Sequence, residues 1–347
     1  MKKAIQTTLA VSIALALTAC NNDNNDPTPT TMDIAGGAVK GALASATVNV
    51  YAANDTAKAT VLATTQTDAN GDYTVQVIDD TGAAITGAFL IEVVADEDTT
   101  MICDASVCGT LSYGDTIPTE ELAGLSLSTI SYSDGEAIDA DVNSLTTMAT
   151  DSILASAAIE GSALDLGNVT AASFLTLQED ASEIVGAILG VDLSESNIFA
   201  IDIVDASNAD TVSTTDSIAA TLTLINASLT SLDVADGSSL ADEIVKYLDA
   251  VEVVTATLLA DPDADLGTGD SAAALATVNA TQAQIADEVD MIAAAVVAET
   301  GGDNIPVTDV PTEVDEDALG DTVGDIITGT GGTGGTGGTG GTGGTGS

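Results

Sequence analysis

Several residue types are missing from this 347-residue sequence: it has no histidine, no arginine and no tryptophan, and only five lysines accompany 54 acidic residues. Without histidine, a Ser–His–Asp or Cys–His relay of the usual kind cannot form. Without arginine, there is no bidentate clamp for phosphate or carboxylate groups. Nucleic-acid binding needs cations that neutralise phosphates, so a formal charge of −49 effectively excludes it.

Aromatic residues and cysteines are also scarce, with three Phe, five Tyr and three Cys. Paired carboxylates can hydrolyse glycosidic bonds, but a cleft that stacks on sugars is hard to assemble from so few aromatic rings. A zinc site would have to combine carboxylates with cysteines, which is an unusual ligand set. The sequence therefore predicts a non-enzymatic protein. The alternatives are a carbohydrate- or polymer-binding accessory module and a hydrolase that uses carboxylates alone.

The N-terminus begins with two lysines followed by an apolar run over residues 4–17. A membrane-spanning helix needs about 20 mainly apolar residues, whereas this run is shorter and contains polar residues such as Gln6 and Ser12. It is typical of a signal segment, so residues 1–19 are expected to be removed from the mature chain. A single transmembrane anchor is the alternative.

The apolar run ends in Leu17-Thr18-Ala19-Cys20, which resembles the lipobox of bacterial lipoproteins. The resemblance implies cleavage before Cys20 and lipidation of that cysteine, with each buried acyl methylene contributing roughly 0.8 kcal/mol to membrane binding. Asn21 resembles the default outer-membrane sorting pattern of Gram-negative lipoproteins. We therefore expect a chain anchored by lipid in the outer membrane, on its periplasmic or extracellular face. A plain cleaved signal peptide is the alternative.

The chain from Cys20 onward is strongly acidic, because 54 acidic residues against three lysines give a formal charge of −51. Such acidity is typical of a solvated, hydration-retaining surface, and specific cation binding is the alternative. Repulsion among the carboxylates destabilises a compact state at low salt, so added salt or calcium should stabilise the fold. Hydrophobic residues still make up 45% of the chain, which favours folding over disorder.

Cys103 and Cys108 are the thiols that remain once Cys20 carries lipid. An exported chain meets oxidising conditions, so a disulfide that closes this short loop is expected. It would contribute roughly 2 kcal/mol through loop entropy. A redox-active pair is the alternative, but the spacing differs from Cys-x-x-Cys and no base is available.

Residues 20–33 are polar and Thr-rich and are expected to form a tether. Over residues 34–94, apolar and polar side chains alternate with a period of two between turn clusters such as Asp-Ala-Asn-Gly at 68–71. Alternation rich in β-branched residues predicts a small antiparallel β-sandwich. We place this sandwich, together with the cysteine loop, at residues 34–135.

Residues 36–51 (GGAVKGALASATVNVY) and 64–75 (TTQTDANGDYTV) resemble the carboxypeptidase regulatory-like domain. That family has a seven-stranded, transthyretin-like β-sandwich in which a G-A-x-V strand is followed by a T-D-x-x-G-x-Y/F hairpin. The resemblance covers residues 34–94 and implies a fold and an accessory, non-catalytic role. It implies no substrate, because the family occurs in adhesins, transport components and enzyme appendages.

Between residues 140 and 300 the period changes to that of amphipathic helices. Ser239 and Asp242 form a capping-box pattern before one helix, and Gln282 is the only polar member of the last apolar seam. The pattern predicts an α-helical bundle of four to six helices. Its stripes comprise Phe174, Leu177, Ala181, Ile184, Val185 and Ile188; Ile218, Leu222, Ile225, Leu229 and Leu232; Leu240, Ile244, Leu248, Val251 and Leu258; and Leu275, Val278, Ile285, Val289, Ile292 and Val296.

Beyond residue 300 the helical periodicity is lost. Residues 301–347 are expected to form an acidic and then Thr-Gly-Gly low-complexity tail. The Thr-Gly-Gly repeats are expected to be flexible, and a docking or polymer-contact role for them is the alternative. The predicted fold class of the whole chain is therefore α+β: a small antiparallel β-sandwich, then an α-helical bundle, then a disordered Gly-rich tail.

One loop between two predicted helices places carboxylates at alternate positions, as oxygen-ligated calcium sites do. The candidate ligands are Asp261, Asp263, Asp265 and Asp270. The loop departs from the EF-hand pattern because Leu266 occupies the sixth position, where glycine makes the turn, and no Glu falls at the twelfth. The alternative to calcium binding is an interhelical turn in which Asp270 caps the next helix.

Together these features predict a non-enzymatic, lipid-anchored, acidic protein of the cell envelope with a structural or surface-interaction role. Calcium is the one cofactor for which the sequence offers candidate ligands. The expected partners are the membrane, through the N-terminal lipid, and an envelope polymer or protein.

Overall fold

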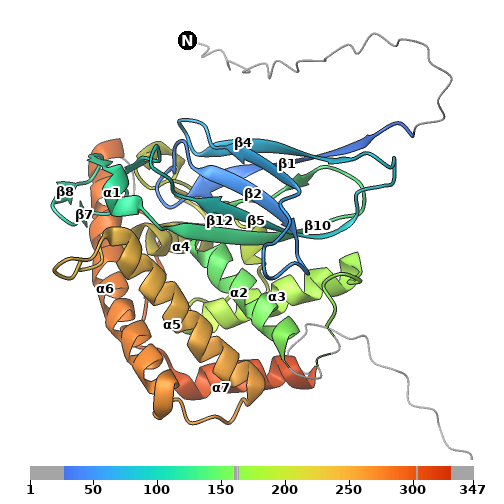
Figure 1. Ribbon diagram of the computed structural model, residues 1–347. Coiled ribbons are helices and arrows are strands. Elements are labelled where there is room, and N and C mark those ends of the chain that lie inside the picture. The colour runs from blue at the N-terminus through green and yellow to red at the C-terminus, as the bar shows by residue number, and fades with distance from the viewer. Residues whose placement is uncertain (1–26, 160–161, 163, 302–303, 330–347) are drawn as a thin grey trace, which may run out of the picture.

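The computed structural model describes residues 27–159, 162, 164–301 and 304–329 (Figure 1). Within them the strands lie between Thr30 and Asn143, and the long helices follow. The chain is thus a mixed α and β protein, which confirms the predicted content of both element types. The signal segment, Cys20 and the Thr-Gly-Gly repeats lie outside the described residues.

Strand β1 (Thr30–Val39) organises the first four-stranded sheet, because it pairs with all three other members. It runs antiparallel to β4 (Asp72–Asp79) and parallel to β11 (Ile138–Asp139) and β12 (Val142–Asn143). The parallel pairs correct the expectation of an entirely antiparallel arrangement. Parallel neighbours need a long crossover connection, and the rest of the strand region separates β1 from β11 and β12.

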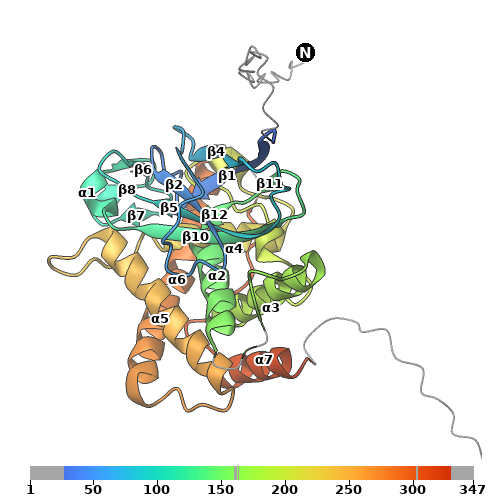
Figure 2. The same cartoon turned by 45° about the vertical axis from the view of Figure 1, so that its right-hand side comes forward.

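The second four-stranded sheet is antiparallel throughout, in the order β10 (Ser126–Ser133), β5 (Gly87–Val94), β2 (Thr47–Ala52) and β3 (Ala63–Gln66). Six of the eight residues of β5 are buried, which is the pattern of a strand covered on both faces. β10 lies against α2 (Ser144–Ala158), so this sheet meets the helices (Figure 2).

Two short strand pairs fill the long connection between β5 and β10. β6 (Met101–Ile102) pairs with β9 (Thr116–Ile117), and β7 (Val107–Cys108) pairs with β8 (Leu111–Ser112). The short helix α1 (Thr119–Leu122) follows them. The predicted cysteine loop thus lies next to a small hairpin.

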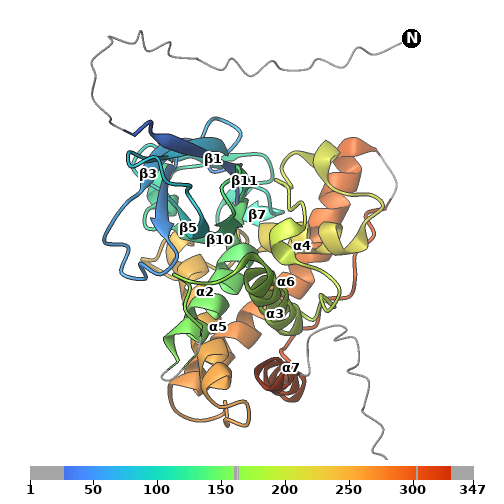
Figure 3. The same cartoon turned by 90° about the vertical axis from the view of Figure 1, so that its right-hand side faces the viewer.

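The helices from α2 onward, called the helical part, lie on one side of the molecule (Figure 3). In it α6 (Gly269–Thr300) packs on α4 (Ser217–Ser228) and α5 (Leu240–Ala260), and α2 packs on α3 (Ala171–Leu189) and α5. Two 3₁₀ turns, η1 (Ile198–Ala200) and η2 (Ala209–Thr211), lie in the connection between α3 and α4. The helix that follows α6 is α7 (Glu316–Thr328).

The predicted apolar stripes form the interior of the helical part: their members are buried except Leu177 and Ile218, which are half-buried. Ser239 and Asp242 make the predicted capping box at the start of α5. Gln282 is fully buried, and its Nε2 donates to the backbone oxygen of Leu189 over 3.2 Å. A polar residue at this seam therefore links α6 to the end of α3.

Helix α7 corrects the expectation that structure ends after Gly301. Asp315 caps its start by accepting a hydrogen bond from the backbone N–H of Ala318, and Gly329 ends it in the left-handed conformation. Leu319 and Val323, one turn apart, are fully buried and hold α7 against the other helices. Residues 302–303 and 330–347 of the expected tail lie outside the described residues.

One continuous cluster of buried apolar side chains runs from Met32 in β1 to Val323 in α7. Strands and helices therefore share a core. None of the helices within the described residues combines the length and the apolar character that crossing a bilayer requires.

Candidate functional site

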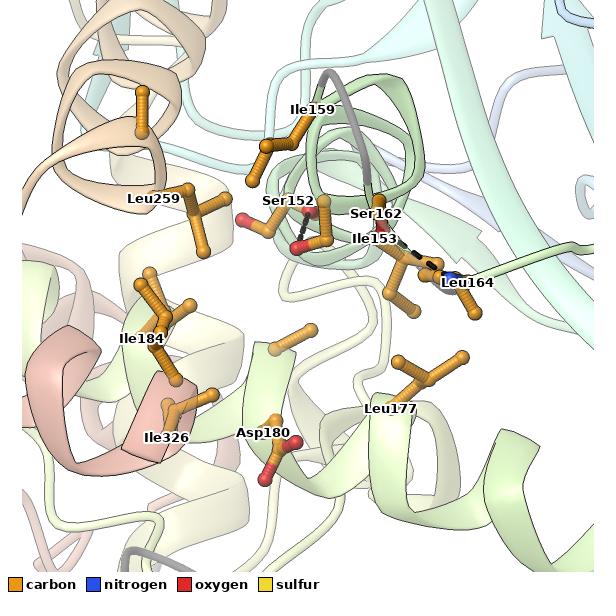
Figure 4. Close-up of a pocket in the computed structure, with 14 residues that line it drawn as sticks. Ser152, Ile153, Ile159, Ser162, Leu164, Leu177, Asp180, Ile184, Leu259 and Ile326 are labelled. Carbon is orange, nitrogen blue, oxygen red and sulfur yellow. Dashed lines mark hydrogen bonds between the residues drawn. The ribbon is translucent and has the colours of Figure 1, made fainter. Parts of the chain in front are cut away.

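A cavity of about 550 Å³ lies between α2, α3, α5 and α7 (Figure 4). α7 contributes Ile326 and Ile327, so the cavity forms only because the C-terminal helix folds back onto the others. The lining is mainly aliphatic, and its other apolar residues are Ile153, Ile159, Leu164, Leu177, Ala181, Ile184, Leu259 and Ala260.

The serine hydroxyls of α2 in this cavity are used by their own helix. Ser152 Oγ donates to the backbone oxygen of Met148 over 2.9 Å. Ser156 Oγ donates to the backbone oxygen of Ser152 over 2.9 Å (Figure 4). Hydroxyls that bond the carbonyl one turn back are satisfied locally. They are therefore not arranged as nucleophiles beside a base.

Asp180 is the one carboxylate among the described lining residues of this cavity. Partial burial, followed by repulsion from Glu183 and Glu179, raises its pKa to about 6. The cavity can thus accommodate a small apolar group beside a carboxyl that takes up a proton near neutral pH. Its described lining offers no nucleophile and base in contact.

The predicted calcium loop connects α5 to α6. Asp261 is the C-terminal cap of α5, and its Oδ1 accepts the backbone N–H of Asp263 over 3.2 Å. Asp265 Oδ1 accepts the backbone N–H of Gly267 over 2.9 Å. The loop thus uses two of its carboxylates to hold its own backbone.

Asp270 lies within the first turn of α6, whereas the capping position is Thr268, which makes no side-chain cap bond. Asp270 as the helix cap is therefore wrong. Among the residues that the structure describes, no cluster of three or more His, Cys, Asp or Glu side chains has the arrangement of a metal site.

Asp263 and Asp265 do face a second hollow, an acidic groove of about 820 Å³ between this loop and α7. Pro262 packs against Gly320 and Gly324 of α7. The carboxylates that α7 adds to the groove are Glu316, Asp317, Asp321 and Asp325. The sequence analysis missed these four because it predicted no helix there; the signals were Asp315 before the helix and the pair Leu319 and Val323.

Cys103 and Cys108 are joined by a disulfide, as predicted. Both are buried, and the loop between them docks on α6 through the backbone N–H of Ser106, which donates to Glu288 Oε1 over 2.7 Å. The bridge therefore stabilises the contact between this loop, which lies among the strands, and α6. This packing favours a structural role over a redox role.

Each lysine of the described part is already engaged. Lys58 pairs with Glu92, Lys246 pairs with Glu243 over 2.8 Å, and Lys40 is fully buried. The many surface carboxylates therefore have almost no cationic partners within the fold. The surface of the described part is therefore electronegative.

Comparison with known proteins gives no support from relatives: no protein-family model, no curated protein and no solved structure matches this chain. The resemblance of residues 36–51 and 64–75 to the carboxypeptidase regulatory-like domain stays a hypothesis.

Proposed function

We propose that this chain is a lipid-anchored, acidic protein of the outer membrane that acts through structural or surface interactions rather than catalysis. The observation that carries the proposal is the lipobox ending at Cys20, close to a first strand that begins at Thr30. A chain reaches at most about 3.6 Å per residue, so ten residues reach no farther than about 35 Å. Lipidation of Cys20 would therefore hold the fold close to the bilayer surface.

The arrangement of elements gives this anchor an orientation. β1 begins at the sheet end of the molecule, whereas α7 lies at the opposite end (Figures 1 and 3). A short anchor before Thr30 favours a pose with the sheets toward the membrane and with α7 and its acidic groove directed away from it. Repulsion between this acidic surface and anionic headgroups favours the same pose.

We also propose that the two four-stranded sheets are the layers of a carboxypeptidase regulatory-like sandwich and that α2 to α6 form a helical bundle on it. The buried alternation of β4, in which Tyr73, Val75 and Val77 face inward, supports the sandwich. The buried seam of α6 supports the bundle.

The partner is an envelope polymer or protein. It presents cations or hydrogen-bond donors to the end of the molecule that carries α7 and the acidic groove. The engagement of Lys40, Lys58 and Lys246 within the fold supports this choice, because few positive charges are left to bind an anion. Nucleic acid is disfavoured for the same reason.

The anchor is tested by Cys20→Ala in the full chain. We expect the wild type to sediment with membranes through salt and carbonate washes and the variant to be released, because lipid is the proposed attachment. Cys103→Ser with Cys108→Ser is the matched control and should stay on the membrane. Retention of Cys20→Ala through the washes would rule out the lipid anchor.

The surface role is tested by protease treatment of intact cells. Loss of the folded part from intact cells would place it on the extracellular face, and protection until the outer membrane is opened would place it in the periplasm. Recovery of the wild-type chain from the inner membrane would contradict the proposed location.

A further inference from the structure

A buried lysine lies where the strand part meets the helices. Lys40, in the turn after β1, has no exposed surface, and its Nζ donates to the backbone oxygen of Asn226 on α4. Desolvation of a buried ammonium is costly unless a carboxylate pairs closely with it, and among the described residues no carboxylate lies within 4.0 Å of Lys40 Nζ. Burial lowers its pKa to about 8, although Asp104 and Asp205 oppose the shift. Neutral amine is therefore accessible near neutral pH.

The amine contacts Asn226 through the backbone oxygen of that residue, and two hydrogen bonds fix the Asn226 side chain in the same buried region. Its Nδ2 donates to the backbone oxygen of Val39 over 2.9 Å, next to Lys40 in the chain. Its Oδ1 accepts the backbone N–H of Ser144, the first residue of α2, over 3.2 Å. Asn226 is 1% exposed, so water is largely excluded. A backbone N–H at a helix N-terminus is placed to stabilise negative charge on that oxygen.

Asp104 supplies a third polar group to the same buried region. It is 1% exposed, and its Oδ1 accepts the hydroxyl of Thr230 over 2.6 Å, four residues after Asn226. Its Oδ2 is buried without a hydrogen-bond partner, which is costly for a carboxylate. Burial raises the pKa of Asp104 to about 6 even though Lys40 opposes the shift. Asp104 can thus exchange a proton near neutral pH.

We propose that Lys40 and Asn226 join through an intramolecular isopeptide bond, with Asp104 as the proton carrier. The neutral Nζ of Lys40 attacks Cγ of Asn226, and the charge that develops on Oδ1 is stabilised by the N–H of Ser144. A side-chain shift brings the Asp104 carboxyl from beyond 4.0 Å to Nζ, where it takes up one proton and then gives it to Nδ2. The Cγ–Nδ2 bond breaks, ammonia leaves, and the Nζ–Cγ amide remains. The reaction consumes no oxidant, reductant or other reactant.

The bond would tie the end of β1 to α4, two elements 186 residues apart in the chain. It would also remove the cost of a buried ammonium, because an amide carries no charge. The acidic chain, which has few ion pairs to hold its two parts together, would gain a covalent link between them.

The direct test is peptide mapping by mass spectrometry of the full wild-type chain extracted from membranes in detergent. Proteolysis after denaturation is expected to give one linked species that contains the Lys40 and Asn226 peptides, with a mass lower than their sum by one ammonia. Recovery of the two peptides separately, with unmodified masses, from the folded wild-type chain would overturn the proposal.

Variants then test the assigned roles. Lys40→Met and Asp104→Asn should each abolish the linked species, and the matched control Lys246→Met, at an exposed lysine, should retain it. Full linkage in Asp104→Asn would overturn the role of Asp104. A linked species in Lys40→Met would overturn the assignment of Lys40 as the nucleophile. The wild-type map decides the existence of the bond even where a variant fails to fold.

Discussion

Gly190 shows how much one residue contributes to the position of the C-terminal segment. It ends α3 at φ +69°, and a Cβ added there would lie 2.3 Å from ring atoms of Pro311. We expect Gly190→Ala to cost more than the roughly 1–2 kcal/mol of a left-handed backbone alone. Gly237→Ala, at φ +86° in open space, is the matched control and should lose only the backbone contribution. Equal losses in denaturant unfolding would contradict the packing of Pro311 on α3.

Single residues also mark the limit of prediction from the sequence. The apolar positions of the stripes, such as Leu222 and Val289, were identified correctly because helical periodicity is local. Lys40, Asn226 and Asp104 were not, because burial of a polar residue depends on partners far along the chain. Only the fold brings Asn226 to Lys40, so no local pattern could reveal this cluster.

At the scale of elements, the C-terminal helix was missed although its signals are local. In α7 the two fully buried positions, Leu319 and Val323, are one turn apart, and Ile326 continues their helical spacing. Asp315 and Gly329 are ordinary helix-ending residues, but the segment is short, contains Gly320 and Gly324, and lies next to the Thr-Gly-Gly repeats. The cavity and the acidic groove both need α7, so neither could be predicted as a site.

The disulfide gives a prediction for the strand part. Cys103→Ser with Cys108→Ser should lower stability by roughly 2 kcal/mol, because the bridge constrains a short loop in the unfolded chain. The Ser106 contact with Glu288 should loosen as well. Thermal unfolding of the variant and of the reduced wild type should agree. Free thiols at both positions in exported wild-type protein would contradict the bridge.

The loop between α5 and α6 gives a prediction about calcium. If Asp261, Asp263 and Asp265 ligate it, calcium should raise the melting temperature more than sodium at the same ionic strength, because ligation is specific whereas screening is not. Asp263→Asn with Asp265→Asn should remove that difference. Equal shifts in both salts, unchanged in the variant, would leave only nonspecific screening.

The whole molecule combines a shared core with carboxyl groups that the core partly encloses. Burial, followed by repulsion from Glu252, raises the pKa of Asp151 to about 7; Lys58 opposes the shift, and Asp249 adds to it. The pKa values of Asp180 and Asp104 are raised to about 6, again mainly by burial. Carboxyls at turns, such as Asp79 at the end of β4 and the exposed Asp165, have lowered pKa values because side-chain and backbone donors bond to them.

These directions predict a stability maximum on the acid side of neutrality. A carboxyl with a raised pKa binds more protons in the folded state, so the stability it gives is present at acid pH and is lost as pH rises through its folded pKa. The melting temperature should therefore rise as pH falls from about 8 to about 5, and fall again below about 4, where carboxyls with lowered pKa values become protonated.

Asp151→Asn should raise the melting temperature at pH 8 and flatten the dependence of melting temperature on pH. The matched control Asp263→Asn, at an exposed loop residue, should leave that dependence unchanged. A melting temperature that rises steadily from pH 5 to pH 8 would show that the buried carboxyls do not control the pH dependence.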